Sequence, residues 1–353
     1  MDQEVRFCTA GDGARLAYAT SGSGPPLVRA PHWFTHLEHD WNNPAMRPWV
    51  AGLSSRYSLL RFDQRGTGLS DREVPIPSWE SHVGDLECVV DAARFERFAL
   101  LGVSQGAAFA IAYAARHPER VSHLVICGGY ARGRETRGLP AVEMDTLIKL
   151  IELGWGRDDP SFRQVFTTRF MPDAGLDAIH AFNDMMPLTA LARTAAQLVQ
   201  ANRGIDVRAE AACVKCPTLV LHARGDLSIP FEEGRLIAGL IPGARFVSLD
   251  TRNHLMMESE PAWQVFLAAL GEFYPPASAA ERAGSFPGLT PRESEVLELI
   301  AQGFDNAQIA AVLGLSEKTV RNNITQLFES LEVDSRARAI VMARENGMGM
   351  ATR

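Results

Sequence analysis

The chain has little of what would place it in a membrane, outside the cell or broadly against nucleic acid. Its 353 residues contain no apolar run of about 18 residues, the length that a membrane-spanning helix needs. Its five cysteines are odd in number and scattered, which favours reduced thiols over a disulfide framework. The net charge of -7 excludes a protein coated in basic surface, so any contact with nucleic acid must be local.

Targeting and phosphorelay features are also missing. The start, MDQEVRFCTAGDG, is too polar for a signal peptide, and we therefore expect a cytoplasmic protein. No segment shows the acidic pocket and phosphoacceptor pattern of a receiver domain, and there is no internal repeat. What is present is ordinary globular composition, with 46% hydrophobic and 22% charged residues. The length suggests one large and one small domain, or two medium ones.

Residues 1–273 alternate short β-type runs with helical stretches, the pattern of a doubly wound, mostly parallel sheet covered on both faces. The predicted strands are residues 26–30, 57–63, 97–103, 121–129, 217–223 and 244–250. The alternation stops between about residues 132 and 210, where helical periodicity takes over. A helical insertion between two strands of such a sheet predicts a lid over the strand ends, where ligands bind.

A candidate nucleophile lies on the turn GVSQG, residues 102–106, between an apolar strand and a helical run. The flanking glycines suit a strained strand-to-helix turn that exposes Ser104. A serine hydroxyl is a weak nucleophile, so it needs a base that an acid orients. Asp226 and His254 each follow a predicted strand. The chain order Ser104, Asp226, His254 therefore indicates a catalytic triad.

The segments FDQRGTGLSD (62–71) and LLGVSQGAAFAIAYAARHPERVSHLV (100–125), with Asp226 and His254, resemble the α/β-hydrolase family over residues 1 to about 273. The resemblance implies an oxyanion hole built from the backbone N–H groups of Gln105 and Trp33. Relatives commonly have His-Gly-x where this chain has Pro31-His32-Trp33, and we expect the side chain of His32 to narrow the hole. In the family, the turn that holds Asp63 and Arg65 braces the sheet.

The predicted ligand pocket lies between the lid and the sheet. We expect it to be lined by His32, Trp33, His36, Gln105 and Leu255. The spacing of His32, His36 and His39 is compatible with a metal site, but the interleaved aromatics favour packing or ligand contact. The pair Cys213 and Cys216 has no second pair and precedes a strand, which favours a structural role over a redox or metal role. We therefore expect no metal and no cofactor.

The last part of the chain predicts a small all-α domain of four helices. Residues 274–288, which include PPASAAERAGSFPG, have no apolar period and indicate a linker before a domain at 289–353. Thr290 and Glu293 form a capping-box pattern, and Ser316 and Ser335 are predicted N-caps. Gly303 and Gly314 stand where a helix end requires a left-handed residue.

Residues 308–324, QIAAVLGLSEKTVRNNI, indicate a helix-turn-helix whose second helix fits a major groove. Val320, Ile324 and Leu327 are spaced to face inward. The polar side chains expected to contact DNA are Ser316, Lys318, Thr319, Arg321, Asn322 and Thr325. From residue 284 onward there are seven Lys and Arg against nine Asp and Glu. Lys318, Arg321, Arg336 and Arg338 must therefore supply the basic footprint, which predicts weak non-specific binding and a need for dimerisation.

Residues 289–347 are similar to the LuxR-type (GerE-like) helix-turn-helix domain, whose pattern LTPRE…VL.LIA.G…..IA..L..S.KTV…I…..L.V.SRA.A is met almost throughout. The resemblance implies that the third helix of this domain binds DNA. It further implies that the fourth helix, at about 335–346, forms a homodimer contact.

Together these features predict a transcription regulator with a sensor of the α/β-hydrolase type. Its expected partners are double-stranded DNA, a small carbonyl, ester or lactone-like ligand and a second copy of the chain, without a membrane. One alternative is an active serine esterase with an appended DNA-binding or dimerisation module. Another is a catalytically inactive scaffold that binds a partner protein.

Overall fold

The structure is a computed structural model that describes residues 3–76, 78–276, 286, 289–345 and 348–349. Within these residues, no helix has both the length and the apolar character needed to cross a membrane. An eight-stranded sheet forms the centre of the larger part, in the order β1-β2-β4-β3-β5-β6-β7-β8. The strands are β1 (Glu4–Thr9), β2 (Arg15–Ser21), β3 (Pro26–Arg29), β4 (Ser58–Phe62), β5 (Phe98–Val103), β6 (Val121–Cys127), β7 (Thr218–Ala223) and β8 (Arg245–Leu249).

Strands β3 to β8 are the six that the sequence predicts, and all neighbouring pairs among them are parallel. The mostly parallel α/β fold is thus confirmed. The sequence analysis missed β1 and β2, which pair antiparallel with each other, while β2 pairs antiparallel with β4. Strand β1 lies at the edge of the sheet and is largely exposed, so it lacks the continuous apolar run that marks the buried strands.

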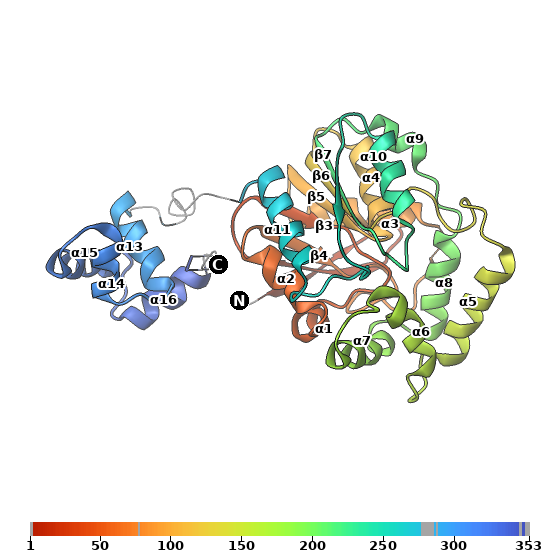
Figure 1. Ribbon diagram of the computed structural model, residues 1–353, viewed down its shortest axis with the longest axis horizontal. Coiled ribbons are helices and arrows are strands. Elements are labelled where there is room, and N and C mark those ends of the chain that lie inside the picture. Colours follow the sequence, from red (N-terminus) through yellow and green to blue (C-terminus); the bar gives the residue numbers. More distant parts are fainter. Residues whose placement is uncertain (1–2, 77, 277–285, 287–288, 346–347, 350–353) are drawn as a thin grey trace.

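Two hydrophobic cores lie on opposite faces of the sheet. Successive residues of β5 alternate between them: Ala99, Leu101 and Val103 belong to one core, whereas Phe98 and Leu100 belong to the other. Helices α2 (Arg47–Ser54) and α11 (Pro261–Phe273) contribute to the first core. Helices α3 (Glu80–Ala92), α4 (Gly106–Arg116) and α10 (Phe231–Leu240) contribute to the second. The sheet is therefore covered on both sides, as predicted (Figure 1).

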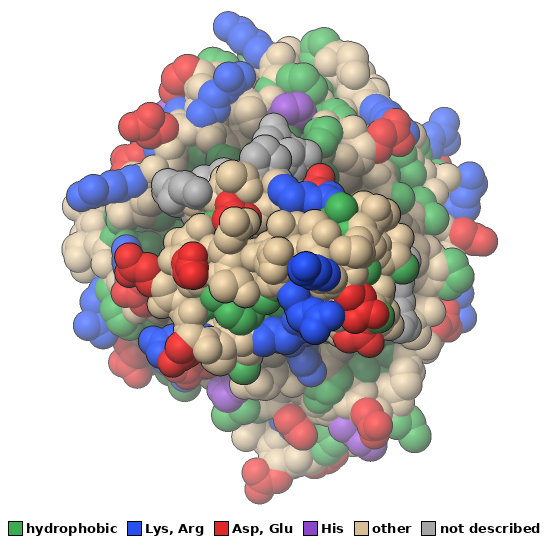
Figure 2. All heavy atoms as spheres, turned by 90° about the vertical axis from the view of Figure 1, so that its left-hand side faces the viewer, with side chains coloured by type: hydrophobic (Ala, Val, Ile, Leu, Met, Phe, Trp, Pro, Cys, Tyr) green, Lys and Arg blue, Asp and Glu red, His purple; other side chains and the backbone are tan. Residues whose placement is uncertain are grey.

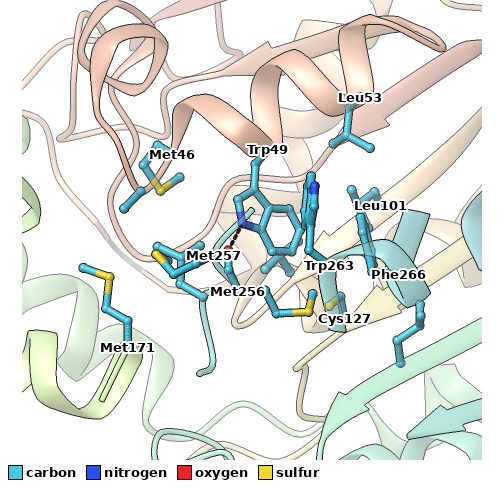
Figure 3. Close-up of a cluster of buried hydrophobic side chains, with 14 of the residues drawn as sticks. Met46, Trp49, Leu53, Leu101, Cys127, Met171, Met256, Met257, Trp263 and Phe266 are labelled. Atoms are coloured by element: carbon cyan, nitrogen blue, oxygen red, sulfur yellow. Dashed lines mark hydrogen bonds between the residues drawn. The ribbon is translucent and has the colours of Figure 1, made fainter. Parts of the chain in front are cut away.

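The first core also anchors a loop that matters for the site. Trp49 of α2 packs against Trp263 of α11, and its indole Nε1 donates a hydrogen bond to the backbone oxygen of Met256, 3.1 Å away (Figure 3). Met256 and Met257 are buried in the same core. The segment that follows β8 is thus held against the sheet by a large, immobile aromatic pair.

The helical insertion lies between β6 and β7. It consists of α5 (Ala141–Gly154), α6 (Ser161–Phe170), α7 (Leu176–Thr189) and α8 (Ala192–Asn202), which we call the lid (Figure 1), and is followed by α9 (Arg208–Cys213). Trp33, in the loop after β3, contacts the rings of Trp155, Phe166 and Phe170. These edge and tilted ring contacts join the lid to the loop at the end of β3.

The C-terminal helices are α13 (Pro291–Ala301), α14 (Asn306–Leu313), α15 (Glu317–Ser330) and α16 (Arg336–Glu345), and they have a core of their own. The predicted capping box of Thr290 and Glu293 is present, and the side chain of Ser316 accepts a hydrogen bond from the backbone of Thr319. Gly303 and Gly314 have φ values of 90° and 65°, as their predicted positions require. Residues 277–285 and 287–288, most of the predicted linker, lie outside the described residues.

Candidate active site and nucleic-acid interface

Ser104 lies on a strained turn between β5 and α4. Its φ is 54°, in the left-handed region that L-residues rarely adopt, and its backbone N–H donates to the oxygen of Cys127 over 3.1 Å. The turn needs both of its glycines. A Cβ at Gly102 would lie 2.7 Å from the Cα of Ala107, and a Cβ at Gly106 would lie 2.8 Å from the oxygen of Pro31. Close backbone packing therefore explains the G-x-S-x-G pattern.

Asp226 and His254 form a tight pair at the ends of β7 and β8. Asp226 Oδ2 is 2.6 Å from His254 Nδ1, and Asp226 Oδ1 accepts hydrogen bonds from the backbone of Ser228 at 2.7 Å and of Ile229 at 2.9 Å. Burial by itself raises the pKa of Asp226, but His254 and the backbone donor outweigh burial and hold that pKa below its usual value. An ionised Asp226 accepts the Nδ1 proton, which leaves Nε2 as the basic nitrogen.

The other imidazole nitrogen is buried without a partner. No described residue forms a hydrogen bond with His254 Nε2. A Cβ at Gly128 would lie 3.1 Å from His254 Cε1, and one at Gly129 would lie 3.5 Å from the backbone oxygen of Ser104. The two glycines after β6 thus leave room for His254 beside the serine turn. Asp226 and His254 thus meet at one end of the sheet, close to the turn that holds Ser104, and Nε2 of His254 carries no hydrogen bond to a described residue.

Side-chain amides tie the two predicted oxyanion-hole segments together. Gln64 Nε2 donates to the backbone oxygen of His32 over 3.0 Å and also to that of Trp33. Gln105 Nε2 in turn donates to Gln64 Oε1 over 3.2 Å. On the other side, Asn202 of the lid donates to Gln105 Oε1 over 2.9 Å. We call Asn202, Gln105 and Gln64 the amide chain; the sequence analysis did not identify it.

A cleft that is partly open to solvent lies between the lid and the sheet and includes Ser104. Trp33 and Gln105 line it, as predicted, together with lid residues such as Leu147, Phe166 and Val199.

Three predicted pocket residues do not line this cleft. His36 instead caps α1 (Leu37–Asn42) by accepting from the backbone of His39, and Leu255 is buried in the first core. His32 also lies away from the cleft lining, and its Nε2 is buried without a partner. Burial, then the charge of Arg29, lowers its pKa well below the usual value. The three side chains were assigned to the pocket only because their loops lie near it. The backbone of these loops directs the side chains away from the cleft.

Charged residues in and beside the lid, which the sequence analysis missed, do line the cleft, namely Arg134, Arg137, Arg169 and Arg203. The stretch ARGRETRG at 131–138 was the available signal for the first two. It was hard to interpret because arginines that contact a ligand and arginines on a solvated turn have the same local pattern.

The turn after β4 braces the structure. Asp63 is fully buried and accepts hydrogen bonds from the backbone of Leu37 at 3.2 Å and of Leu69 at 2.9 Å. Arg65 forms a buried bidentate pair with Asp85, at 2.7 and 2.6 Å, and contacts Asp12 at 2.6 Å. Both side chains are buried, and neither residue lines the cleft. Their arrangement is that of a structural clamp.

Outside the Asp226–His254 pair, the cysteines and histidines that the structure describes meet only in twos, such as Cys8 with Cys88, whose sulfurs are 3.4 Å apart. In the part of the chain that the structure describes, no group of three His, Cys, Asp or Glu side chains is placed to hold a metal ion. Cys213 is exposed and Cys216 is partly buried just before β7, and both are free thiols.

Helix α15 presents its polar residues to solvent. Lys318, Arg321, Asn322 and Thr325 are exposed, and so are Ser316 and Thr319 at its start. Val320, Ile324 and Leu327 are buried, as the spacing predicts. Figure 2 shows the end of the molecule that carries α13–α16, where a few Lys and Arg side chains gather beside Asp and Glu side chains, without a broad basic surface. The side chains of α15 that are free to contact a DNA groove are therefore few.

Arg336 was expected to be one of the basic side chains that contact DNA, but the structure gives it another role. Its Nη1 donates to Asn306 Oδ1 over 2.9 Å, and its Nη2 donates to the backbone oxygen of Phe304. Arg336 is only partly exposed, whereas Arg338 is exposed. Arg336 thus joins α16 to the start of α14, which makes it a structural residue of the domain.

Comparison with known proteins gives two family matches. Residues 38–261 match the alpha/beta hydrolase fold, and residues 287–343 match bacterial regulatory proteins of the luxR family. The chain is 25% identical over 265 residues to pyrrolizixenacetamide deacetylase of Xenorhabdus hominickii, an alignment that covers 74% of this chain and 94% of the relative.

Solved structures agree on the fold. A hydrolase from Pseudomonas aeruginosa PA01 superimposes with a TM-score of 0.64 and 26% identity, covering 76% of this chain and 98% of that one. The enol-lactonase of Burkholderia xenovorans LB400 has a TM-score of 0.61 at 23% identity, over 76% and 99% of the two chains, and shows the fold alone. The chain belongs to the alpha/beta hydrolase fold family and carries a luxR-family helix-turn-helix domain at residues 287–343.

Proposed function

We propose that the protein is a transcription regulator in which ligand binding to the cleft beside Ser104 controls DNA binding by α15. One observation carries this proposal: a chain whose helix α15 exposes Lys318 and Arg321 also has a cleft lined by Ser104. The buried Asp226–His254 pair lies behind that cleft, because the His254 ring contacts Phe170 of its lining. A luxR-family domain supports DNA binding, because that family consists of bacterial regulatory proteins. A ligand that contacts both the sheet and the lid can shift the lid's position, and through it the DNA-binding state.

The proposal predicts DNA affinity that depends on the ligand. DNA selected from a random duplex library by the full chain would be titrated by fluorescence anisotropy, with and without small esters and lactones. Leu147→Trp fills the cleft from α5, whereas Val142→Trp adds the same ring to the exposed side of that helix. Ser104→Ala and Leu147→Trp should both reduce the ligand response, and Val142→Trp should preserve it. A full response in both cleft variants would refute the proposal.

The same geometry supports a second candidate, an active serine hydrolase. Ser104 Oγ would attack a carbonyl carbon while His254 Nε2 takes the hydroxyl proton, and Asp226 would stabilise the resulting imidazolium. The backbone N–H groups of Gln105 and Trp33 would stabilise the negative oxygen. Collapse of this intermediate returns the proton to the leaving group and leaves an acyl group on Ser104. Water then releases the acid by the same steps.

Hydrolysis of p-nitrophenyl acetate by the full chain tests this candidate. The observation that favours it is the unpartnered Nε2 of His254 beside a left-handed Ser104. We expect a rate above that of Ser104→Ala, with an initial burst if the acyl group leaves slowly. Identical rates for the two proteins would eliminate hydrolysis and leave ligand sensing unaffected.

A further inference from the structure

Three guanidinium groups line the cleft without a counterion. Arg134 and Arg137 lie in the turn after β6, and Arg169 lies on α6. Within the described residues, none of their side chains forms an ion pair or a hydrogen bond, although Arg137 lies over the ring of Tyr130 at 5.7 Å. Two neighbouring arginines behave differently, since each has its own carboxylate.

The neighbouring pairs show that carboxylates are available nearby. Arg203 also lines the cleft, but its Nε lies 3.1 Å from Glu135. Arg132 lies 2.6 Å from the buried Glu233. Glu135 and Glu233 are thus already paired with arginines outside the group of three. We call Arg134, Arg137 and Arg169 the arginine cluster.

Two members of the arginine cluster, Arg134 and Arg137, are partly buried among like charges. Burial, followed by repulsion from Arg169 and Arg137, lowers the pKa of Arg134 to about 10, with Tyr130 and Glu143 opposing the shift. Burial also lowers the pKa of Arg137. The charges of Arg132 and Arg169 lower this pKa further, whereas Glu233 and Tyr130 raise it. Like charges held together in a partly buried cleft are costly unless an anion joins them.

Other polar atoms of the cleft are also unpartnered. Asn202 Oδ1, Trp33 Nε1 and Arg137 Nε are buried and have no hydrogen-bond partner among the described residues. All three residues line the cleft, and Asn202 is only 6% exposed. Buried polar groups normally find partners, so their grouping around one cleft indicates a polar ligand.

We propose that the ligand of this cleft is an anionic carbonyl compound, whose carboxylate or phosphate group binds the arginine cluster while its carbonyl lies at Ser104. The inference rests on the proposed function and replaces the expectation of a neutral ester or lactone with an acidic one. Arginine suits this role because its planar fork binds carboxylate and phosphate oxygens in pairs. Both ends of such a ligand would meet the same cleft, because Ser104 and the three arginines all line it.

Two esters that differ only in charge test the proposal. Mono-p-nitrophenyl glutarate ends in a carboxylate where p-nitrophenyl valerate ends in a methyl group. Binding would be measured calorimetrically on the full-length Ser104→Ala variant, so that turnover does not enter. We expect the glutarate ester to bind at least about tenfold more tightly, since each charge-assisted contact contributes about that factor.

Arginine variants in the Ser104→Ala background identify the group that binds the charge. Arg169→Gln, at an exposed position, should weaken binding of the glutarate ester by about tenfold and leave the valerate ester unchanged. Arg134→Gln should do the same. Arg193→Gln is the matched control, because Arg193 lies on the lid, pairs with Glu73 at 3.0 Å and does not line the cleft.

Competition with free anions shows whether the arginine cluster binds a carboxylate or a phosphate. Displacement of the glutarate ester by free glutarate but not by inorganic phosphate assigns a carboxylate, and the reverse assigns a phosphate. Displacement by neither, or equal affinity for both esters in every variant, would overturn the inference. Selective binding of the anionic ester without any effect on DNA affinity would instead support the inference and contradict the regulatory function.

Discussion

Asn202, at the end of lid helix α8, donates a hydrogen bond from Nδ2 to Oε1 of Gln105, 2.9 Å away. Gln105 is the residue whose backbone N–H is proposed to stabilise an oxyanion, and its side chain continues through Gln64 to the loop that holds Trp33. The amide chain therefore connects the lid with both halves of the proposed hole. A ligand that moves α8 would alter both halves together.

Asn202→Ala should lower kcat for p-nitrophenyl acetate by about tenfold with little change in KM, because Gln105 loses the partner that holds its side chain. Asn202→Asp, of equal size, should be equally impaired because an ionised carboxylate has no proton to donate. Gln200→Ala changes an exposed amide on the same helix and serves as the control. Steady-state kinetics decide; full activity in Asn202→Asp would exclude this role.

Asp226→Asn should abolish hydrolysis almost as completely as Ser104→Ala, by a factor of about 10⁴ where turnover is measurable. The amide can donate to His254 Nδ1 and so stabilise the tautomer that carries its proton on Nε2. The backbone donors of Ser228 and Ile229 remain in place, so the fold should persist. Kinetics combined with circular dichroism would check this, and a folded variant with normal turnover would remove Asp226 from the mechanism.

Asp63 should make stability depend on pH. Burial raises its pKa to about 7, although the backbone of Leu69 and Leu37 opposes the shift. The folded chain thus keeps a proton that the unfolded chain releases near pH 4. The contribution is fully present below about pH 4 and is lost as pH rises to about 7, at roughly 1.4 kcal/mol per pH unit.

Asp63→Asn cannot titrate and supplies the reference. The unfolding free energies of the wild type and of this variant would be measured with urea at pH 4.5 and pH 7. Between these pH values, the wild type should lose stability relative to the variant. A difference independent of pH would show that Asp63 keeps its ordinary pKa in the fold.

Arg321→Ala should weaken binding to a selected DNA site by about 1–3 kcal/mol if the guanidinium contacts a base edge. If it contacts a phosphate, affinity should fall by a similar factor on all DNA sequences. The slope of log K against log salt concentration should then become less steep by about one. Arg235→Ala, an exposed change of equal charge on α10, is the control. Anisotropy titrations at several salt concentrations distinguish these cases, and unchanged affinity would remove Arg321 from the interface.

Arg336→Ala should destabilise the C-terminal helices by about 2 kcal/mol, because Asn306 and the oxygen of Phe304 lose a charged donor. Arg338→Ala removes the same charge at an exposed position and should leave stability unchanged. Thermal unfolding of the full chain, followed at the transition of these helices, would compare the two. Equal stability would show that the contacts of Arg336 contribute nothing.

Strands β3 to β7 were predictable because buried strands carry continuous apolar runs. The helix ends were predictable because Thr290, Ser316 and Gly314 have local capping roles. Ser104, Asp226 and His254 could be chosen because each follows a strand, and parallel strands end at the same edge. Strand β1 escaped prediction because an exposed edge strand has no such run. Strand β2 is largely buried, and its short run LAYA was not enough to predict it.

The chain's local patterns therefore determined its elements, their order and the residues at the strand ends. Only the tertiary structure decided which side chains meet above them. It turned His36 toward α1, placed Asn202 on Gln105 and gathered Arg134, Arg137 and Arg169 around one cleft. The physical reason is that caps and apolar periodicity act within a few residues, whereas the cleft is formed by segments that approach each other only when the lid packs on the sheet.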